Sequence, residues 1–306
     1  MYLQVALASL FVTAHCQTKV VLTNDDGWAV AQIRAQNDAL KAAGYNVILS
    51  APAENQSGTG SNSATPTPLT EPCQFDSCPA GSPAEGFNAS DPRLNYVNAF
   101  PVDAVKFGIQ TLSPMFFDSA PDFVVSGPNI GFNLGPGVSG SGTVGAACEA
   151  SKEGIPSIAV SGESTSSKSY TTLQSDPNSL NSLASEVNSQ LTVKLVNALL
   201  ASPARPVLPS DTILNINFSP VLPLLCPSAD DYKFVLTRLI PDPFHLAKDV
   251  NTCGSDHLQD EIFVMLKTLG RCHVTISVID ATTKADVDAT RQAAVLDRLS
   301  SILSCL

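Results

Sequence analysis

The segment KVVLTNDDG (Lys19–Gly27) is a short, largely β-branched run that ends in a polar turn. Apolar residues at helical spacing follow over residues 33–43, then a glycine, and then a second apolar run, Asn46–Ser50. A strand, a polar loop, a helix and a strand within about thirty residues are typical of a right-handed βαβ unit with parallel strands. The segment therefore predicts a parallel sheet with an acidic turn at the carboxyl end of its first strand.

Two later segments favour the same fold. Asp122–Ser126 and Ser157–Ser161 are nearly continuous apolar runs, and a helix is predicted between them over Thr143–Glu153. Such runs are typical of strands buried on both faces by helices, so we expect an α/β fold with a doubly wound, three-layer sheet of mostly parallel strands. The C-terminal part predicts a helix over Leu180–Leu200, strands around Thr212–Phe218, Lys233–Leu239 and His273–Ile279, and a final helix over Ala285–Leu303.

Composition divides the chain into three parts. Residues 1–16 contain an apolar run without an acidic group and end in small residues, which predicts a signal peptide and a secreted protein; a first strand or an anchor is the alternative. Residues 17–202 are expected to form the catalytic core, with irregular excursions over residues 58–101, which are rich in Ser, Pro, Thr and Gly. Residues 203–306 are expected to complete the fold and to offer an oligomer interface.

The eight cysteines agree with export. Without Cys16 seven remain, and Cys148 is expected to be free because it lies in an apolar helical stretch. Cys73 and Cys78 predict a local disulfide, whereas three pairings are open to Cys226, Cys253, Cys272 and Cys305. Sequons begin at Asn88, at Asn217 and formally at Asn55, and predict a glycoprotein.

The charge balance limits the class of partner. Lys and Arg total 17 against 28 for Asp and Glu, which gives a formal net charge of -11, and the chain has no basic run. Binding to a nucleic-acid polymer depends on cationic side chains that neutralise phosphates, so such a partner is not expected. A small anionic substrate would need a metal ion to offset the repulsion.

Three polar loops follow predicted strands: Asn24–Gly27, Ala51–Gly58 and Ser126–Gly131. In open α/β sheets ligands bind outside the carboxyl ends of the strands, so these loops are expected to converge. Two adjacent carboxylates repel each other unless a cation lies between them, and hard cations prefer carboxylate, hydroxyl and amide oxygens. The sequence therefore predicts a site for one divalent cation, Mg²⁺, Mn²⁺ or Ca²⁺, with the ligands Asp25, Asp26, Ser57 and Asn129. Two solvated Asp residues in a turn are the alternative.

The Gly- and Ser-rich loop Gly137–Gly145 leads directly into the predicted helix. Backbone N–H groups at a helix start, together with the Ser141 and Thr143 hydroxyls, favour an anion such as phosphate. The loop also matches G-x-G-x-x-G, but no strand directly precedes it, which argues against a dinucleotide fold. The chain has no Walker A sequence and no G-x-S-x-G elbow, so a P-loop kinase and an α/β-hydrolase esterase are not expected.

Five ordered blocks between Lys19 and Ser161 resemble the SurE family of survival proteins and 5′/3′-nucleotidases, which has secreted, acid-phosphatase-like fungal members. The blocks are Thr23–Gly27, Ala51-Pro52 with Asn55–Gly58, Pro101–Asp103, Ser126–Gly135 and Ser141–Ala147. The resemblance implies hydrolysis of phosphate monoesters, commonly nucleoside monophosphates, and assembly into dimers or tetramers through C-terminal segments. We therefore expect a small phosphate ester as the substrate and a homodimer.

The resemblance also assigns residues. It implies the same four metal ligands, of which Asp25, Asp26 and Asn129 are also the expected catalytic residues, and it places Asn24, Asn133, Ser141, Gly142 and Thr143 on the phosphate side. Bacterial members have Ala-Pro-Gly where this chain has Ala29-Val30-Ala31, and Thr where it has Phe100. These departures concern the mouth of the site and its nucleotide specificity.

Other interpretations remain open. The chain is alternatively a binding module that keeps the fold and metal without turnover, or a metal-dependent hydrolase that cleaves another bond. His245, His257 and His273 are candidate general acids, although surface or packed histidines are the commoner case. Trp28, next to the acidic turn, is predicted either to stack on an aromatic leaving group or to cover the first helix.

Overall fold

A computed structural model of the chain describes residues 17–163, 166–267 and 270–306. The expected signal peptide, Cys16 included, lies outside the described residues. Within them, no helix has the length and apolar character needed to cross a membrane.

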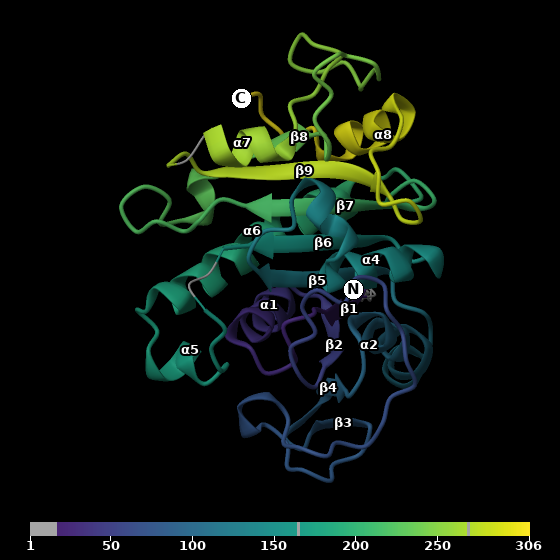
Figure 1. Cartoon of the computed structure of the whole chain (residues 1–306), viewed down its shortest axis with the longest axis vertical. Coiled ribbons are helices and arrows are strands. Elements are labelled where there is room, and N and C mark those ends of the chain that lie inside the picture. The colour runs from purple at the N-terminus through teal and green to yellow at the C-terminus, as the bar shows by residue number, and fades with distance from the viewer. Residues whose placement is uncertain (1–16, 164–165, 268–269) are drawn as a thin grey trace, which may run out of the picture.

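The described residues form a sheet of nine strands in the order β3-β4-β2-β1-β5-β6-β7-β9-β8 (Figure 1). Neighbouring strands are parallel except for the pairs β3–β4 and β7–β9. The strands are β1 (Lys19–Thr23), β2 (Asn46–Pro52), β3 (Glu85–Asn88), β4 (Asp91–Val97), β5 (Phe123–Ile130), β6 (Ser157–Gly162), β7 (Thr212–Phe218), β8 (Lys233–Thr237) and β9 (His273–Asp280). Because β2 lies on one side of β1 and β5 on the other, the topological switch point falls beside the end of β1.

Helices cover both faces of the sheet. On one face α1 (Ala31–Ala42), α6 (Leu180–Ala201) and α8 (Ala289–Leu299) contribute to the largest hydrophobic core. On the other, α2 (Pro101–Phe107) and α4 (Gly142–Lys152) pack on β1 and β5. The predicted fold class, a mostly parallel α/β sheet between helical layers, is confirmed. The remaining helical segments are α3 (Ser113–Phe117), α5 (Thr172–Ser175), α7 (Glu261–Lys267), a π-helix over Gly108–Leu112, and short 3₁₀ turns over Gln74–Asp76, Gly135–Ser139 and Ala229–Asp231.

The region read as irregular contains two strands that the sequence did not predict, and the unpredicted helix α2 begins at its last residue. β3 and β4 form a hairpin, and β4 pairs in parallel with β2. Only the second half of β4, Leu94–Val97, is buried, so its hydrophobic pattern is short and follows Pro92. The start of α2 is marked by Pro101 and by Asp103, whose carboxylate accepts a hydrogen bond from the Phe100 N–H at 3.2 Å.

The disulfides agree with the expected local bridge and resolve the open pairings. Cys73 is bonded to Cys78, Cys226 to Cys272, and Cys253 to Cys305. Cys148 is free and buried in α4, and burial raises the pKa of its thiol to about 11. The thiol is therefore kept in its unreactive, protonated form.

The structure corrects one of the sequon assignments. Asn217 is 0% exposed on β7 and its side chain is hydrogen-bonded, so the prediction that it accepts a glycan is wrong. Asn88 is half-buried in the β3–β4 hairpin, and Asn55 is exposed.

Removing the Cys226–Cys272 disulfide should lower the free energy of unfolding by about 2–4 kcal/mol, because this bond closes a long loop in the unfolded chain. The cysteines are 46 residues apart and join the loop after β7 to the start of β9. Urea unfolding of the double Cys226→Ala, Cys272→Ala variant measures the change. An unfolding midpoint equal to that of the unaltered protein would contradict this expectation.

Candidate functional site

The carboxyl ends of the central parallel strands meet at one edge of the sheet, where the arrowheads of β5, β6 and β7 lie on the same side of the molecule (Figure 1). Thr23, the last residue of β1, is in register with Ser126 of β5. The acidic turn after β1 therefore lies beside the last residues of β5, which include Asn129. This agrees with the expectation that the polar loops converge.

Asp25 occupies the centre of this region and is only 2% exposed. The Thr143 hydroxyl donates to Asp25 Oδ1 at 2.6 Å and also lies 3.3 Å from Asn129 Oδ1. Backbone N–H groups of Gly142 and Thr143, at the start of α4, are further hydrogen-bond donors to the Asp25 carboxylate. Side-chain oxygens from the turn after β1 and from β5 thus both lie within hydrogen-bonding distance of one hydroxyl of α4.

Asp26 and the Ser57 loop are tied to the same turn. Asp26 Oδ2 accepts a hydrogen bond from the Ile130 N–H at 2.7 Å, directly after Asn129. The Gln56 N–H donates to the Asp25 carbonyl at 2.7 Å, so the residue before Ser57 is joined to the acidic turn. Ser57 itself is exposed at the mouth, and its N–H donates to Asn55 Oδ1 at 2.8 Å.

Burial makes the acidic pair costly to ionise without a cation. Burial raises the pKa of Asp25, and burial followed by repulsion from Asp25 raises the pKa of Asp26 well above its usual value. Among the ion pairs of the described ranges, none includes either carboxylate. A bound divalent cation would favour the charged forms, and the side-chain oxygens around it suit a hard ion.

The side chains near the acidic pair do not match a zinc centre. Over residues 17–163, 166–267 and 270–306 there is no cluster of three or more His, Cys, Asp or Glu side chains that could hold a metal ion. A cation at Asp25 and Asp26 would therefore depend on amide, hydroxyl or water oxygens for its other ligands. Such a set is typical of Mg²⁺, Mn²⁺ or Ca²⁺ and atypical of zinc.

Several residues expected on the phosphate side have structural partners. Asn24 is 0% exposed, and its side chain donates to the Gly27 carbonyl and accepts from the Gly27 N–H, so it shapes the acidic turn. Ser141 caps α4, because its hydroxyl accepts from the Val144 N–H at 3.1 Å. These contacts favour a structural role for the Asn24 and Ser141 side chains over direct contact with phosphate. Gly142 and Thr143 contact Asp25 from the helix start.

Asn133 is connected to Asn129 by way of Ser161 in β6. Its side-chain amide donates to Ser161 Oγ at 2.8 Å, and Ser161 is the strand partner of Asn129. Its backbone is held by two asparagines of β7: the Asn133 N–H donates to Asn217 Oδ1 at 2.9 Å, and Asn215 Nδ2 donates to the Asn133 carbonyl at 2.8 Å. The loop after β5 is therefore fixed to the strands beside it.

Sequence reasoning missed the residues that support these loops from a distance. Gln74, inside the small disulfide loop, donates through its side chain to the Asp26 carbonyl at 3.0 Å. Glu261 at the start of α7 is 0% exposed and accepts a hydrogen bond from the Gly135 N–H at 2.8 Å. Asparagines at 215 and 217, alternating with apolar residues in a strand, were the available signal for polar contacts at this end of the sheet.

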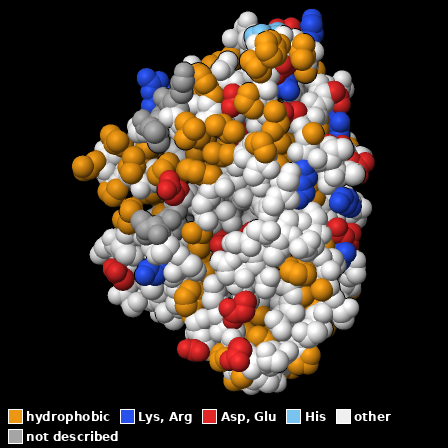
Figure 2. Space-filling model, in the orientation of Figure 1, with side chains coloured by type: hydrophobic (Ala, Val, Ile, Leu, Met, Phe, Trp, Pro, Cys, Tyr) orange, Lys and Arg blue, Asp and Glu red, His pale blue; other side chains and the backbone are white. Residues whose placement is uncertain are grey.

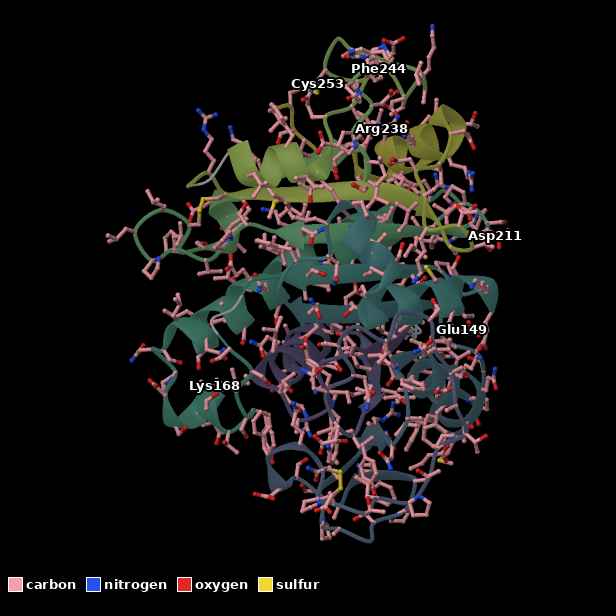
Figure 3. All side chains as sticks on the ribbon, viewed as in Figure 1. Glu149, Lys168, Asp211, Arg238, Phe244 and Cys253 are labelled. Carbon is pink, nitrogen blue, oxygen red and sulfur yellow. A yellow bond between two sulfur atoms is a disulfide. The ribbon has the colours of Figure 1, made fainter. Side chains whose placement is uncertain are left out.

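The remaining sequence-based candidates are a tryptophan and three histidines. Trp28 is 2% exposed and packs against Tyr96 and Arg34, so the proposed stacking on a substrate is wrong and the covering role is correct. His245 and His257 contact each other, with ring centroids 4.0 Å apart, and line a separate cavity of about 200 Å³. This cavity lies in the loop that carries Phe244 and Cys253 at the top of Figure 3. His273 is buried, and burial lowers its pKa.

Comparison with known proteins gives the family. A sequence model described as Survival protein SurE matches residues 20–242. The chain belongs to the SurE family. The resemblance expected from the five motifs is thereby confirmed.

Curated relatives match about half of the chain. An acid phosphatase of Yarrowia lipolytica is 46% identical over 151 residues, which are 48% of this chain and 42% of that protein. A 5′-nucleotidase SurE of Desulfovibrio desulfuricans is 41% identical over 145 residues, 47% of this chain and 50% of that protein. The chain thus spans about half the length of these relatives.

A solved SurE structure has the same fold. The crystal structure of the SurE protein from Aquifex aeolicus aligns with a TM-score of 0.59 and 23% identity, and the alignment covers 91% of this chain and 98% of that one. Strands and helices beyond the sequence match therefore also follow the SurE architecture.

Gly142→Ala should destabilise the site, because an added Cβ would lie 2.9 Å from both Asp25 Cβ and Pro101 Cγ. We expect a loss of about 1–3 kcal/mol in the free energy of unfolding, with weaker Mn²⁺ binding. Thermal unfolding and Mn²⁺ titration measure the two effects. Gly140→Ala is the matched control, since its Cβ would meet only the Gly137 carbonyl, at 3.9 Å. Equal unfolding free energies and equal Mn²⁺ affinities in the two variants would refute the close approach at Gly142.

Glu261 gives a pH-dependent prediction. Burial raises its pKa from 4.5 to about 8, against opposing hydrogen bonds from Gly135, Ser277 and Asn215. A carboxyl whose folded pKa is raised stabilises the fold below its unfolded pKa and loses that contribution as pH rises through the folded pKa. The stability of the unaltered protein relative to Glu261→Gln should therefore fall between pH 4.5 and about 8. Urea unfolding of both across this range tests it, and a pH-independent difference would show that Glu261 titrates normally.

Proposed function

We propose that this SurE chain is a divalent-metal-dependent phosphomonoesterase of the nucleotidase or acid-phosphatase type. The observation that carries the proposal is the meeting of Asp25, Asn129 and the start of α4 around the Thr143 hydroxyl. In this proposal the cation is bound by Asp25, Asp26, Ser57 and Asn129, and its ester substrate is a small molecule such as a nucleoside monophosphate. The similarity to an acid phosphatase of Yarrowia lipolytica and a 5′-nucleotidase SurE of Desulfovibrio desulfuricans supports this substrate class.

The bound cation would supply Lewis-acid stabilisation of the phosphoryl oxygens and lower the pKa of a water molecule at the site. The chain's own residues would orient the reactants. Asp25 is fixed by Thr143 Oγ1, and Asp26 is fixed by the Ile130 N–H, so neither carboxylate needs to reorganise. The positive end of α4 faces the same point and would favour an anionic group there.

We infer that water, instead of the Asp25 carboxylate, attacks phosphorus. Asp25 Oδ1 is already engaged by the Thr143 hydroxyl, and backbone N–H groups at the start of α4 are further donors to the carboxylate. These bonds withdraw electron density from the carboxylate and restrict its approach to a phosphorus atom.

Export is part of the proposal. Three disulfides in the described residues are typical of proteins that fold in an oxidising compartment. The similarity to a fungal acid phosphatase agrees with a secreted protein. The low proportion of basic residues leaves the metal as the main attractive charge for a phosphate ester.

The direct test is release of phosphate from p-nitrophenyl phosphate and from nucleoside monophosphates, with Mg²⁺, Mn²⁺ or Ca²⁺ and with EDTA. We expect turnover only with a cation. Acetylated sugars test the alternative of a hydrolase that cleaves another bond, and we expect no deacetylation. Asp25→Asn should lower kcat by on the order of 10²- to 10³-fold and weaken Mn²⁺ binding together, because the ligand charge is removed.

Asp118→Asn is the control, since it makes the same charge change on an exposed residue whose left-handed backbone suits asparagine. Normal turnover and tight Mn²⁺ binding in Asp25→Asn would overturn the assignment of the metal site. Metal binding without phosphate release in the unaltered protein would instead indicate a binding module.

A further inference from the structure

Glu261 is a buried acidic residue that the proposed chemistry does not use. It begins α7, beyond the residues 20–242 that match the SurE model. Its backbone is fixed to the extension of β8, because the Glu261 N–H donates to the Arg238 carbonyl at 2.8 Å. Arg238, labelled in Figure 3 at the base of the top loop, is itself held by ion pairs with Asp249 and Asp286.

The Glu261 carboxylate is surrounded by donors from three separate elements. The Gly135 N–H donates to Oε1 at 2.8 Å, and the Ser277 hydroxyl of β9 donates to Oε2 at 2.8 Å. Asn215 Nδ2 of β7 lies 3.2 Å from Oε1 and 3.1 Å from Oε2. One side chain of α7 therefore contacts strand β7, strand β9 and the loop after β5.

Two of these contacts lead directly to Asn133. Asn215 Nδ2 also donates to the Asn133 carbonyl at 2.8 Å, so a single amide group connects Glu261 with Asn133. Gly135, two residues later, has a φ of +53°, and a Cβ there would lie 2.6 Å from Ile262 Cδ1. The loop Gly131–Gly135 is thus pressed against the first turn of α7, and the carboxylate fastens its C-terminal end.

The position favours a specific role for this carboxylate over general stabilisation. Replacing a buried charged group by a packed apolar one is often neutral or stabilising, so a buried acid is weak support for stability alone. Within the part of the chain that the structure describes, this acid forms no ion pair, and its hydrogen bonds join it to neighbouring elements. The protonated form of Glu261 would also fit. The Ser277 hydroxyl lies 2.9 Å from Thr237 Oγ1 and can donate to Thr237 instead of to Glu261.

We propose that Glu261 is a positioning residue, which holds the loop Gly131–Gly135 so that Asn133 stays against Ser161, the strand partner of Asn129, on the phosphate side of the proposed site. The C-terminal part of the chain is then a component of the catalytic site. This inference rests on the proposed phosphomonoesterase function and adds a residue to its phosphate side.

The test compares Glu261→Ala, Glu261→Gln and Ser277→Ala in the full-length protein. Glu261→Ala removes the acceptor of the Gly135 N–H and should raise KM for p-nitrophenyl phosphate and the inhibition constant of inorganic phosphate by on the order of 10- to 100-fold. Glu261→Gln keeps an oxygen for Gly135 and a donor for Ser277, so it should restore KM to near its original value.

Ser277→Ala is the matched control. Ser277 is 0% exposed, and its substitution removes a hydrogen bond to Glu261 Oε2, whereas the Gly135 N–H donates to Oε1. Ser277→Ala should lower the melting temperature, as we also expect for Glu261→Ala, without changing KM. Parallel increases of KM in Ser277→Ala and Glu261→Ala, or no increase in Glu261→Ala, would overturn the positioning role.

Hydrogen–deuterium exchange gives a readout that does not depend on turnover. The peptide that contains residues 131–135 should exchange at least tenfold faster in Glu261→Ala than in Ser277→Ala. If the unaltered protein releases no phosphate, the proposed function fails, while the exchange rates still decide whether Glu261 holds the loop. Equal protection of this peptide in the two variants would refute the anchoring.

Discussion

The burial of two adjacent carboxylates at the end of β1 is the constraint on which the site depends. Asp25 and Asp26 are each only 2% exposed, and both pKa values are raised by burial. The surroundings supply directed donors: the Thr143 hydroxyl for one carboxylate and the Ile130 N–H for the other. Such an arrangement is stable with charged carboxylates only when further positive charge is at hand, which is the physical basis for a cation at this edge of the sheet.

The polar network extends from this pair across the sheet. Asn129 and Ser161 are strand partners, Ser161 contacts Asn133, and Asn133 is held by the asparagines of β7. Glu261 then joins β7 and β9 to the same loop. Consecutive strands therefore hold the site. Figure 2 shows hydrophobic side chains gathered on the upper part of this face of the molecule. In the C-terminal part of the chain, Leu224, Leu225 and Leu266 are exposed.

Local pattern was sufficient for the fold class and for much of the site. The strand over residues 19–23, the strand that starts at residue 157 and the acidic turn were recognisable because continuous apolar runs ended in polar loops. Parallel strands place such loops at a common edge, so convergence of Asp25 with Asn129 followed from topology. The same reasoning failed for β4, whose exposed first half hides its period, and for the final helix, which begins only after the Asp288 cap and ends at Leu299.

The sequence by itself determined the α/β class, the acidic turn, the SurE motifs and the unpaired Cys148, because each is written in a short run of neighbouring residues. Only the tertiary structure decided which cysteines pair, that Asn217 is an internal support instead of a surface residue, and that Glu261 reaches Gly135 across 126 positions of sequence. These contacts arise from the packing of β7, β9 and α7 against a loop from the other half of the chain. No local pattern encodes them, since their partners become neighbours only when the sheet is assembled.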